Sequence, residues 1–424
     1  MPRASLSPHR RARTAGFLGI AAAIAALSTG CGDTPVAGPD LTISAPPTTI
    51  GPSRIDDGVL RLSVHLPTTG AGARLGVPMS DAVRVAVSAI NAAGGVLGEP
   101  VEVDFVDEAT SVDLRATIQA GADAIIGPAS STKTLAVLNQ AVEAGVLVCS
   151  PSATAQLLDR FPDANLFYRT VGSDGLQMSA LARTAARTGS GSITIVHLDD
   201  LYGRGLAESL ATAVGARASL SVSETIPFSG DDTDLSDEAT AALSNGARII
   251  AVLGDTDDGG RMLSAIDAAL AANPEVATPF IVVNDSLRTA TDVIAGLSNR
   301  LRATIVGVAP RAIVTAVESP VGAFATNAYD CAMLIALAAL QAGSDAPRSI
   351  ANQMASVSAG GRVCTTFAEC ADLIDQGLQI DYNGLSGNVD LSSTGDLTKA
   401  WFREFRFDET GREYIFNETG FEAP

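Results

Sequence analysis

This chain of 424 residues lacks the sequence motifs of the common enzyme classes. There is no Gly-x-Ser-x-Gly loop for a serine nucleophile and no Gly-Lys-Ser/Thr loop for phosphates. No group of histidines and cysteines has the spacing of metal ligands. Of the three histidines, His9 lies in the N-terminal leader, and His65 and His197 lie within predicted strands, where we expect packed core residues. The sequence therefore predicts a protein without catalysis, metal or cofactor.

Basic residues are scarce. The chain holds 28 lysines and arginines against 47 aspartates and glutamates, a formal net charge of -19 at pH 7. Such a surface repels the phosphate backbone of nucleic acids, so we exclude nucleic acid as a partner. Hydrophobic residues, in contrast, make up 46% of the chain, which is ample material for the cores of two or three domains.

Long apolar segments are absent except near the N-terminus. Residues 15–27 form an apolar run of 13 residues behind a basic stretch that contains Arg3 and Arg13. A helix of that length reaches only about 20 Å of a hydrocarbon core about 30 Å thick. The run therefore predicts the hydrophobic region of a signal peptide rather than a membrane span.

A cysteine follows this region. The sequence Leu-Ser-Thr-Gly-Cys at residues 27–31 resembles a bacterial lipobox, in which Cys31 becomes the lipidated first residue of the mature protein. The usual aliphatic residue three positions before the cysteine is Ser28 here, and Leu27 lies one position earlier. We predict a lipoprotein signal peptide at residues 1–31. An ordinary secretory signal with an incidental cysteine is the alternative, and the choice between the Sec and twin-arginine routes stays open.

The segment at residues 32–57 predicts a linker. It contains five prolines with scattered glycine, serine and threonine, and it has no apolar periodicity. Segments of this composition are extended and semi-flexible. We expect a tether that lets a folded domain stand off the membrane to which Cys31 anchors it.

Residues 124–154 are the most informative stretch of the folded part. Two apolar runs of strand length end at Gly127-Pro128 and at Ser150-Pro151, and apolar residues at helical spacing lie between them. The pattern predicts strand, helix, strand, with hydroxyl groups and free backbone N–H groups at the carboxyl ends of both strands. Ligands bind at that edge of open α/β sheets, and a helix N-terminus favours an anion. Serines and threonines also cap helices in general, so the argument rests on two such loops lying side by side.

Strands and helices alternate along the rest of the chain. Predicted strands lie at residues 60–66, 101–106, 193–197, 219–226, 249–253 and 280–283, and predicted helices at 79–92, after Tyr202, after Asp258 and at 321–342. This alternation predicts parallel sheets flanked by helices, in an α/β fold. The units are too many for one sheet, which favours two lobes. The tail at residues 401–407 predicts a final strand near a sheet edge.

The first loop contains a competing motif. Gly70-x-Gly72-x-x-x-Gly76 looks like a variant dinucleotide-binding loop between a strand and a helix. However, three residues separate the strand from Gly70, and the next strand reaches Asp107 about thirty residues after Gly76 instead of about twenty. A nucleotide-cofactor enzyme is therefore the weakest of our alternatives.

Six segments in a fixed order carry a resemblance to a known family. They are Ile90-Asn91-Ala92-Ala93-Gly94-Gly95-Val96-Leu97-Gly98, Ile126-Gly127-Pro128 with Ser130-Ser131, Ser150-Pro151-Ser152-Ala153-Thr154, Tyr202-Gly203-Arg204-Gly205, Ala328-Tyr329-Asp330, and Gly384-x-x-Gly387-x-x-Asp390 with Gly395-Asp396. Each is weak alone, but the ordered set is specific. The chain is similar to the periplasmic binding protein type I family, specifically the leucine/isoleucine/valine-type substrate-binding lipoproteins of branched-chain amino acid ABC transporters.

The resemblance implies two Rossmann-like lobes joined by three crossovers, with a ligand in the cleft between them. A ligand that contacts both lobes favours the closed form. The crossovers are expected near residues 170–172, 307–311 and 386–396. Lobe 1 would comprise residues 58–171 and 310–390, and lobe 2 residues 172–309 and 391–424.

The first lobe would hold the ligand α-carboxylate. In the family this is done by a serine at the position of Ser131 and a threonine at the position of Thr154, with backbone groups around Ser152 and Ala153. Hydrogen bonds to a charged group contribute about 1.5 to 3 kcal/mol each. Three or four of them can compensate for desolvating a carboxylate without a basic side chain.

The second lobe would complete the site. Tyr202 matches a family tyrosine that contacts the ligand, and Asp285 sits where members place an acid for the α-ammonium. Asp255 could serve instead or add a second acceptor. A tyrosine packed on the surface and a helix-capping aspartate are the structural alternatives for Tyr202 and Asp285. Leu75 stands where some members have a tyrosine, which leaves side-chain selectivity open.

The four cysteines after Cys31 are consistent with an exported protein, in which disulfides can form. Cys364 and Cys370 bracket a short polar segment, and a disulfide that closes this loop would add about 2 kcal/mol by the chain-entropy model. A reduced pair is the alternative. We expect Cys149 and Cys331 to be buried, inert thiols.

Together these features predict an extracytoplasmic, lipid-anchored solute-binding subunit of an ABC importer. It would be a monomer that captures an amino acid, branched-chain or related, and delivers it to the permease without chemical turnover. A ligand-sensing receptor module of the same fold is the alternative.

Overall fold

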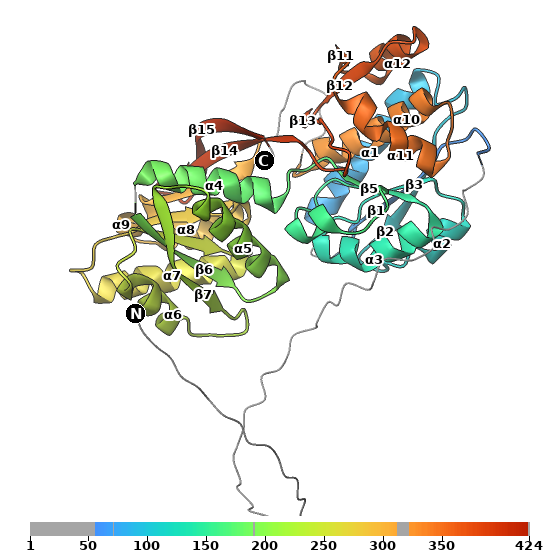
Figure 1. Ribbon diagram of the computed structural model, residues 1–424. Helices are drawn as coiled ribbons and strands as arrows, with labels where there is room; N and C mark the ends of the chain where they lie inside the picture. The colour runs from blue at the N-terminus through green and yellow to red at the C-terminus, as the bar shows by residue number, and fades with distance from the viewer. Residues whose placement is uncertain (1–55, 71, 190, 312–321, 423–424) are drawn as a thin grey trace, which may run out of the picture. The chain divides into compact units, whose positions relative to one another are not determined.

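The computed structural model describes residues 56–70, 72–189, 191–311 and 322–422 (Figure 1). The predicted signal peptide with Cys31 and nearly all of the predicted linker lie outside these residues. Three sheets, of five, seven and three strands, organise the described part of the chain.

The five-stranded sheet is parallel throughout, in the order β2-β1-β3-β4-β5. Its strands are β1 (Arg61–Leu66), β2 (Glu102–Asp107), β3 (Ala124–Ile126), β4 (Leu147–Ser150) and β5 (Phe167–Arg169). Every residue of β3 and β4 is buried, as the two continuous apolar runs predict. Because all five strands run the same way, their carboxyl ends lie along one edge of the sheet.

Helices cover both faces of this sheet. Leu62 and Val64 of β1 share one apolar core with helices α1 and α10, whereas Ile125 of β3 and Val148 of β4 pack with α3 in another. The helices associated with the sheet are α1 (Ala73–Ala92), α2 (Arg115–Gln119), α3 (Ser131–Ala144), α10 (Ala325–Ala342) and α11 (Pro347–Ser358). Within the described ranges no helix combines the length and the apolarity that crossing a membrane requires.

Helix α1 begins earlier than the sequence predicts, at Ala73 instead of Met79. Pro78 lies inside the helix and removes one backbone donor, which hides the true start from a reading of the sequence. Gly76 is therefore helical rather than part of a loop. A Cβ atom at Gly76 would lie 2.0 Å from the carbonyl oxygen of Pro67, so this glycine lets the helix pack against the loop after β1.

The seven-stranded sheet has the order β15-β14-β10-β9-β8-β6-β7. Its strands are β6 (Gly191–Leu198), β7 (Leu220–Phe228), β8 (Ile249–Leu253), β9 (Phe280–Val283), β10 (Ile305–Pro310), β14 (Lys399–Phe407) and β15 (Glu413–Glu422). Strands β6 to β10 are parallel, and β14 and β15 are antiparallel to their neighbours.

Helices also flank the seven-stranded sheet on both faces (Figure 1). One core includes α4 (Asp174–Thr188) and α5 (Leu201–Gly215), and the other includes α6 (Ser236–Ser244), α7 (Thr256–Ala272) and α8 (Thr291–Gly296). A short helix, α9 (Asn299–Arg302), precedes β10. The two large sheets and their helices confirm the predicted α/β fold.

The tail strand is not the last one, contrary to the sequence-based expectation. β14 lies between β10 and β15, and β15 forms the edge of the sheet. Phe405 of β14 pairs with Gly307 of β10, and a Cβ atom at Gly307 would lie 2.0 Å from the Phe405 ring. Gly307 is therefore a packing position inside a strand, and the connection that leaves this sheet begins after Pro310.

Within the described ranges, the chain crosses from one large sheet and its helices to the other at three places. The connections follow β5 at residues 170–173, β10 at residues 311–324, and β13 at residues 389–398. The third, small sheet has the order β11-β12-β13 and lies just before the last connection. It comprises β11 (Arg362–Cys364), β12 (Ile380–Gly384) and β13 (Gly387–Asn388), with α12 (Phe367–Asp375) between β11 and β12.

The described residues contain two disulfides. Cys364 is joined to Cys370, the pair singled out by sequence. Cys149 is joined to Cys331, so the expectation of two buried thiols was wrong. Their Cα atoms are 5.9 Å apart because α10 packs on β4, and this brings together residues 182 positions apart. The spacing of the cysteines in the sequence does not predict that contact.

The two disulfides should differ in what they contribute to stability. In the chain-entropy model a bridge over 182 residues adds about 5 kcal/mol and one over six residues about 2 kcal/mol. We expect Cys149→Ala with Cys331→Ala to lower the melting temperature more than Cys364→Ala with Cys370→Ala. Thermal unfolding of both double variants without ligand makes the comparison, and equal losses would contradict it.

Candidate functional site

The loops after β3 and β4 lie side by side because the two strands pair in register. Ile126 lies opposite Cys149, and the backbone N–H of Gly127 donates to the carbonyl of Cys149 at 2.9 Å. Gly127 has a φ of 111°, and a Cβ atom there would lie 2.0 Å from the His65 carbonyl oxygen. Only glycine therefore allows the chain to turn this close to β1.

Hydroxyl groups join the two loops. Ser150 Oγ donates to the carbonyl of Pro128 at 2.7 Å, and Ser152 Oγ donates to the carbonyl of Ala129 at 2.8 Å. Ser131 Oγ accepts from the backbone N–H of Ala155 at 3.1 Å. The hydroxyl of Ser152 therefore donates its hydrogen bond within the protein. The hydroxyl of Ser131 only accepts there, so it can still donate to a ligand.

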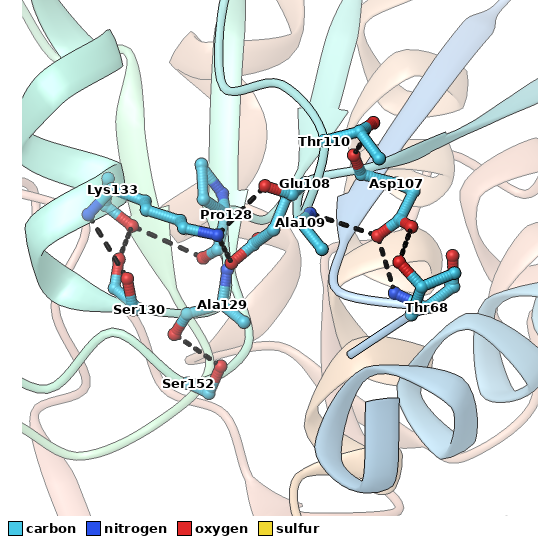
Figure 2. Close-up of polar contacts among 12 residues, drawn as sticks. Thr68, Asp107, Glu108, Ala109, Thr110, Pro128, Ala129, Ser130, Lys133 and Ser152 are labelled. Atoms are coloured by element: carbon cyan, nitrogen blue, oxygen red, sulfur yellow. Dashed lines mark hydrogen bonds and ion pairs between the residues drawn. The ribbon is translucent and has the colours of Figure 1, made fainter. Parts of the chain in front are cut away.

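Glu108, the residue just after β2, supports the loop after β3 (Figure 2). Its side chain is 3% exposed and accepts from the backbone N–H of Ala129 at 2.8 Å. Lys133 Nζ lies 3.5 Å from the other carboxylate oxygen and donates to the Glu108 carbonyl at 2.9 Å. Burial raises the pKa of Glu108, and Ala129 and Lys133 oppose the rise. The sequence reasoning missed this residue, although an acid just past a strand end was its visible signal.

Asp107 organises the first loop instead of facing a cofactor ribose. Its carboxylate accepts from the backbone N–H of Thr68 at 2.9 Å and from Thr69 Oγ1 at 2.5 Å (Figure 2). The hydrogen bond from the Thr69 side chain has the largest effect, and together these hydrogen bonds lower the pKa of Asp107 to about 2. With Gly76 inside α1, the acid and the last glycine of the dinucleotide-like motif both have a structural explanation.

Tyr202 lies in the first turn of α5, half-buried. Its hydroxyl accepts from Asn284 Nδ2 at 3.1 Å and lies 3.1 Å from Ser286 Oγ. Asn284 is fully buried and also bonds both backbone groups of Gly254. The ring is therefore held from the end of β9, immediately beside Asp285.

The two candidate acids behave differently. Asp255 is exposed and caps α7, accepting from the backbone N–H of Asp258 at 2.8 Å. Asp285 does not cap a helix with its side chain. Burial raises the pKa of Asp285, and a hydrogen bond from Gln177 of α4 opposes the rise. Asp285 and Tyr202 interact electrostatically, so the structure groups these two and gives Asp255 the structural role.

Asp174 is a second buried acid that the sequence reasoning missed. It begins α4, its side chain is 2% exposed, and its backbone N–H donates to the Thr154 carbonyl at 2.8 Å. Burial raises its pKa to about 7, a hydrogen bond from the Thr154 side chain opposes this, and the charge of Asp285 adds to it. An acid in the first turn of a helix is common because it interacts favourably with the helix dipole, so nothing in the sequence marks Asp174 as special.

Thr154, Asp174, Asp285 and Tyr202 thus form one interacting group. Two carboxyl groups that share a buried environment and have raised pKa values attract a cation, because a positive charge relieves the cost of ionising both. The adjoining loops after β3 and β4 offer backbone N–H groups and the Ser131 hydroxyl, which suit an anion. The arrangement can hold a small molecule that carries both charges. The described residues contain no histidine, cysteine and acid cluster arranged for a metal ion.

A comparison with family models agrees with this picture. The model of the periplasmic binding proteins matches residues 60–365, which is most of the chain. This chain belongs to the periplasmic binding protein family. The match spans the five-stranded sheet, the parallel strands of the seven-stranded one and α10.

Relatives with similar sequences extend over most of the chain. The chemotactic signal transduction system substrate-binding protein BasB of Halobacterium salinarum is 30% identical over 77% of this chain and 82% of its own length. The Leu/Ile/Val-binding protein homolog 3 of Brucella melitensis is 27% identical over 82% of this chain and 92% of its own length.

Solved structures share the fold. The branched-chain amino acid transporter substrate-binding protein LivJ of Streptococcus pneumoniae, in complex with isoleucine, has a TM-score of 0.61 at 20% identity, covering 86% of this chain and all of that one. The leucine-binding protein LivK of Thermotoga maritima has a TM-score of 0.62 at 19% identity, covering 85% of this chain and 98% of that one. At these identities the likeness establishes the periplasmic binding protein type I fold.

Asp174 should make stability depend on pH. Its carboxyl has a pKa of about 7 in the folded protein and an ordinary value of 3.8. The folded protein therefore holds this proton more tightly, and its stability falls as pH rises from about 4 to about 7. We expect Asp174→Asn to remove a destabilisation of up to about 4 kcal/mol at pH 8.

Melting temperatures of the ligand-free variant and parent between pH 4 and 8 test this expectation. The advantage of the variant should grow with pH and level off above pH 7. Asp292→Asn, which removes an exposed acid from the first turn of α8, is the control. An advantage of Asp174→Asn that does not change with pH would contradict the assignment.

Proposed function

We propose that this protein is the extracytoplasmic solute-binding subunit of an ABC importer and that it binds an amino acid, branched-chain or related. The observation that carries the proposal is the grouping of Thr154, Asp174, Asp285 and Tyr202 beside the two hydroxyl-rich loops. Binding takes place without chemical turnover, because the site offers acceptors and donors but no nucleophile with its base.

The ligand carboxylate is held by the Ser131 hydroxyl and by backbone N–H groups around Ser152, Ala153 and Thr154. Asp285, with Asp174 behind it, accepts from the ligand ammonium, and Tyr202 packs beside the ligand. Each hydrogen bond to a charged group contributes about 1.5 to 3 kcal/mol. The names of the Brucella relative and of the Streptococcus structure support a branched aliphatic side chain in the remaining space.

The proposed molecular organisation follows the two large sheets. Lobe 1 comprises residues 58–171 and 310–390, and lobe 2 comprises residues 172–309 and 391–424. The ligand site lies in a cleft between these lobes, which close on the ligand and present it to the permease. A lipid at Cys31 and the linker that follows hold this monomeric receptor at the outer surface of the cell membrane.

Titration calorimetry with a panel of amino acids, their amides and small carboxylates tests the ligand class. We expect saturable binding of one or more branched-chain amino acids, and weaker binding of molecules that lack either the α-carboxylate or the α-ammonium. Absence of saturable binding throughout the panel would count heavily against a transport receptor.

Variants of the two ends of the site should lose affinity without losing stability. Ser131→Ala removes the hydroxyl that donates to the ligand carboxylate, and Asp285→Asn removes the charge that faces the ligand ammonium. Each loss corresponds to a roughly ten- to hundredfold rise in Kd. The melting temperature of the ligand-free protein should change little. Thr212→Val and Asp292→Asn are the matched controls, since both residues are exposed helical positions. Unchanged affinity in both site variants would show that the site is misplaced.

A sensory receptor of the same fold is the second candidate. The observation that favours it is the likeness to the chemotactic substrate-binding protein of Halobacterium salinarum. Uptake of the radiolabelled ligand by cells that lack this protein separates the two. Lost uptake supports import, whereas normal uptake with a lost tactic response supports sensing.

A further inference from the structure

Arg169 is the last residue of β5 and is fully buried. An arginine side chain carries five N–H donors in a rigid planar fork, and its charge is costly to bury unless those donors are paired. The partners of Arg169 are therefore informative about what this position does.

The guanidinium binds the loop that begins the candidate carboxylate site. Nη1 donates to the carbonyl of Ala153 at 3.3 Å and to that of Ala155 at 3.2 Å. Nη2 pairs with Asp159, which lies in the short 3-10 helix at the end of the same loop. One side chain thus contacts residues 153–159 at three points.

The same side chain holds the last connection between the two large sheets. Arg169 Nε donates to Asp396 at 2.7 Å, and its backbone N–H donates to the carbonyl of Gly395 at 3.0 Å. Gly395 has a φ of 82°, and a Cβ atom there would lie 2.1 Å from the Phe167 carbonyl oxygen. The connection therefore approaches β5 as closely as the backbone permits.

Peptide geometry links these contacts to the ligand. A trans peptide unit is planar, so its C=O and its N–H point in opposite directions. Because the carbonyl of Ala153 points at Arg169, the N–H of Thr154 in the same peptide unit points away from it. The Thr154 hydroxyl is hydrogen-bonded to Asp174, so this backbone N–H is the donor that the residue retains for a ligand carboxylate.

We propose that Arg169 is a positioning residue that aims the Thr154 amide at the ligand carboxylate and ties this loop to the last connection between the sheets. This inference rests on the proposed function, in which residues 152–155 hold a carboxylate. Arg169 does not touch the ligand itself. It acts through the two carbonyls that it binds, and its fork is needed because a lysine ammonium is a point charge that cannot span four acceptors in one plane.

Arg169→Lys is the test variant and Arg302→Lys its matched control. Arg302 is also buried and also donates to two carbonyls, those of Ala295 and Leu297, and to one side chain, that of Asn299. It lies in α9, which precedes β10 of the seven-stranded sheet. General effects of replacing a buried arginine fork should appear in both variants.

Calorimetry with L-leucine and L-leucinamide separates positioning from stability. The two probes share the ammonium and the side chain, and only the first has a carboxylate. We expect Arg169→Lys to weaken L-leucine binding at least tenfold and L-leucinamide binding much less, so that the ratio of the two Kd values moves toward one. Equal weakening of both probes, or the same change in Arg302→Lys, would overturn the proposal.

Hydrogen–deuterium exchange of the ligand-free protein gives a readout that does not depend on the ligand. We expect faster exchange of the amides at residues 152–157 in Arg169→Lys than in the parent and in Arg302→Lys. Unchanged exchange overturns the positioning role. If the parent binds neither probe, the proposed ligand class fails, and this measurement alone then decides the role of Arg169.

A second variant covers the case in which Arg169→Lys does not fold. Asp396→Asn keeps the arginine and its carbonyl contacts but removes the charge on the last connection. We expect faster exchange at residues 152–157 and a threefold or larger weakening of L-leucine binding that exceeds the effect on L-leucinamide. An effect confined to residues near 396 would overturn the link between the loop and the connection.

Discussion

The parallel pairing of β3 with β4 is the constraint on which the candidate site depends. Their register ends both strands at the same level, and each ends in a proline-containing turn rich in small hydroxyl residues. A slip by one residue would exchange the side chains between the two helix-covered faces of the sheet and would move the two strand ends out of line. The loops meet because this register brings the two strand ends together, and the hydroxyl contacts of Ser131, Ser150 and Ser152 build on that meeting.

Buried charged side chains then fix the orientation of the loops that the register brings together. Glu108, Arg169 and Asp174 are almost fully buried, and each holds backbone groups of the loops or interacts with the neighbouring acids. Groups of this kind contribute little net stability, because desolvation offsets most of the attraction. Their concentration around a few loops is better explained by the need to fix backbone donors in one orientation. The fold places the loops at one edge of the sheet, and these buried charges set the directions of their backbone donors.

Local patterns predicted much of the fold and only part of the candidate site. Apolar runs located β3, β4, β8 and β9 closely because strands buried on both faces need continuous hydrophobic sequence. Asp174 and Glu108 escaped because their partners come from other elements, and an isolated acid carries no sign of such partners. The same holds for the Cys149–Cys331 bridge. The start of α1 was missed because a proline is typical of the first turn of a helix, whereas Pro78 lies inside this one.

The position of α10 has a consequence for the growing polypeptide. The five strands of the first sheet are complete once residue 169 has been made, yet α10, which packs on β3, β4 and α1, arrives about 150 residues later. Until then the nascent sheet exposes an apolar face, while the whole parallel part of the second sheet is being synthesised. Transiently exposed apolar surface of this kind is prone to aggregation, and the risk lasts until α10 has been synthesised and packed.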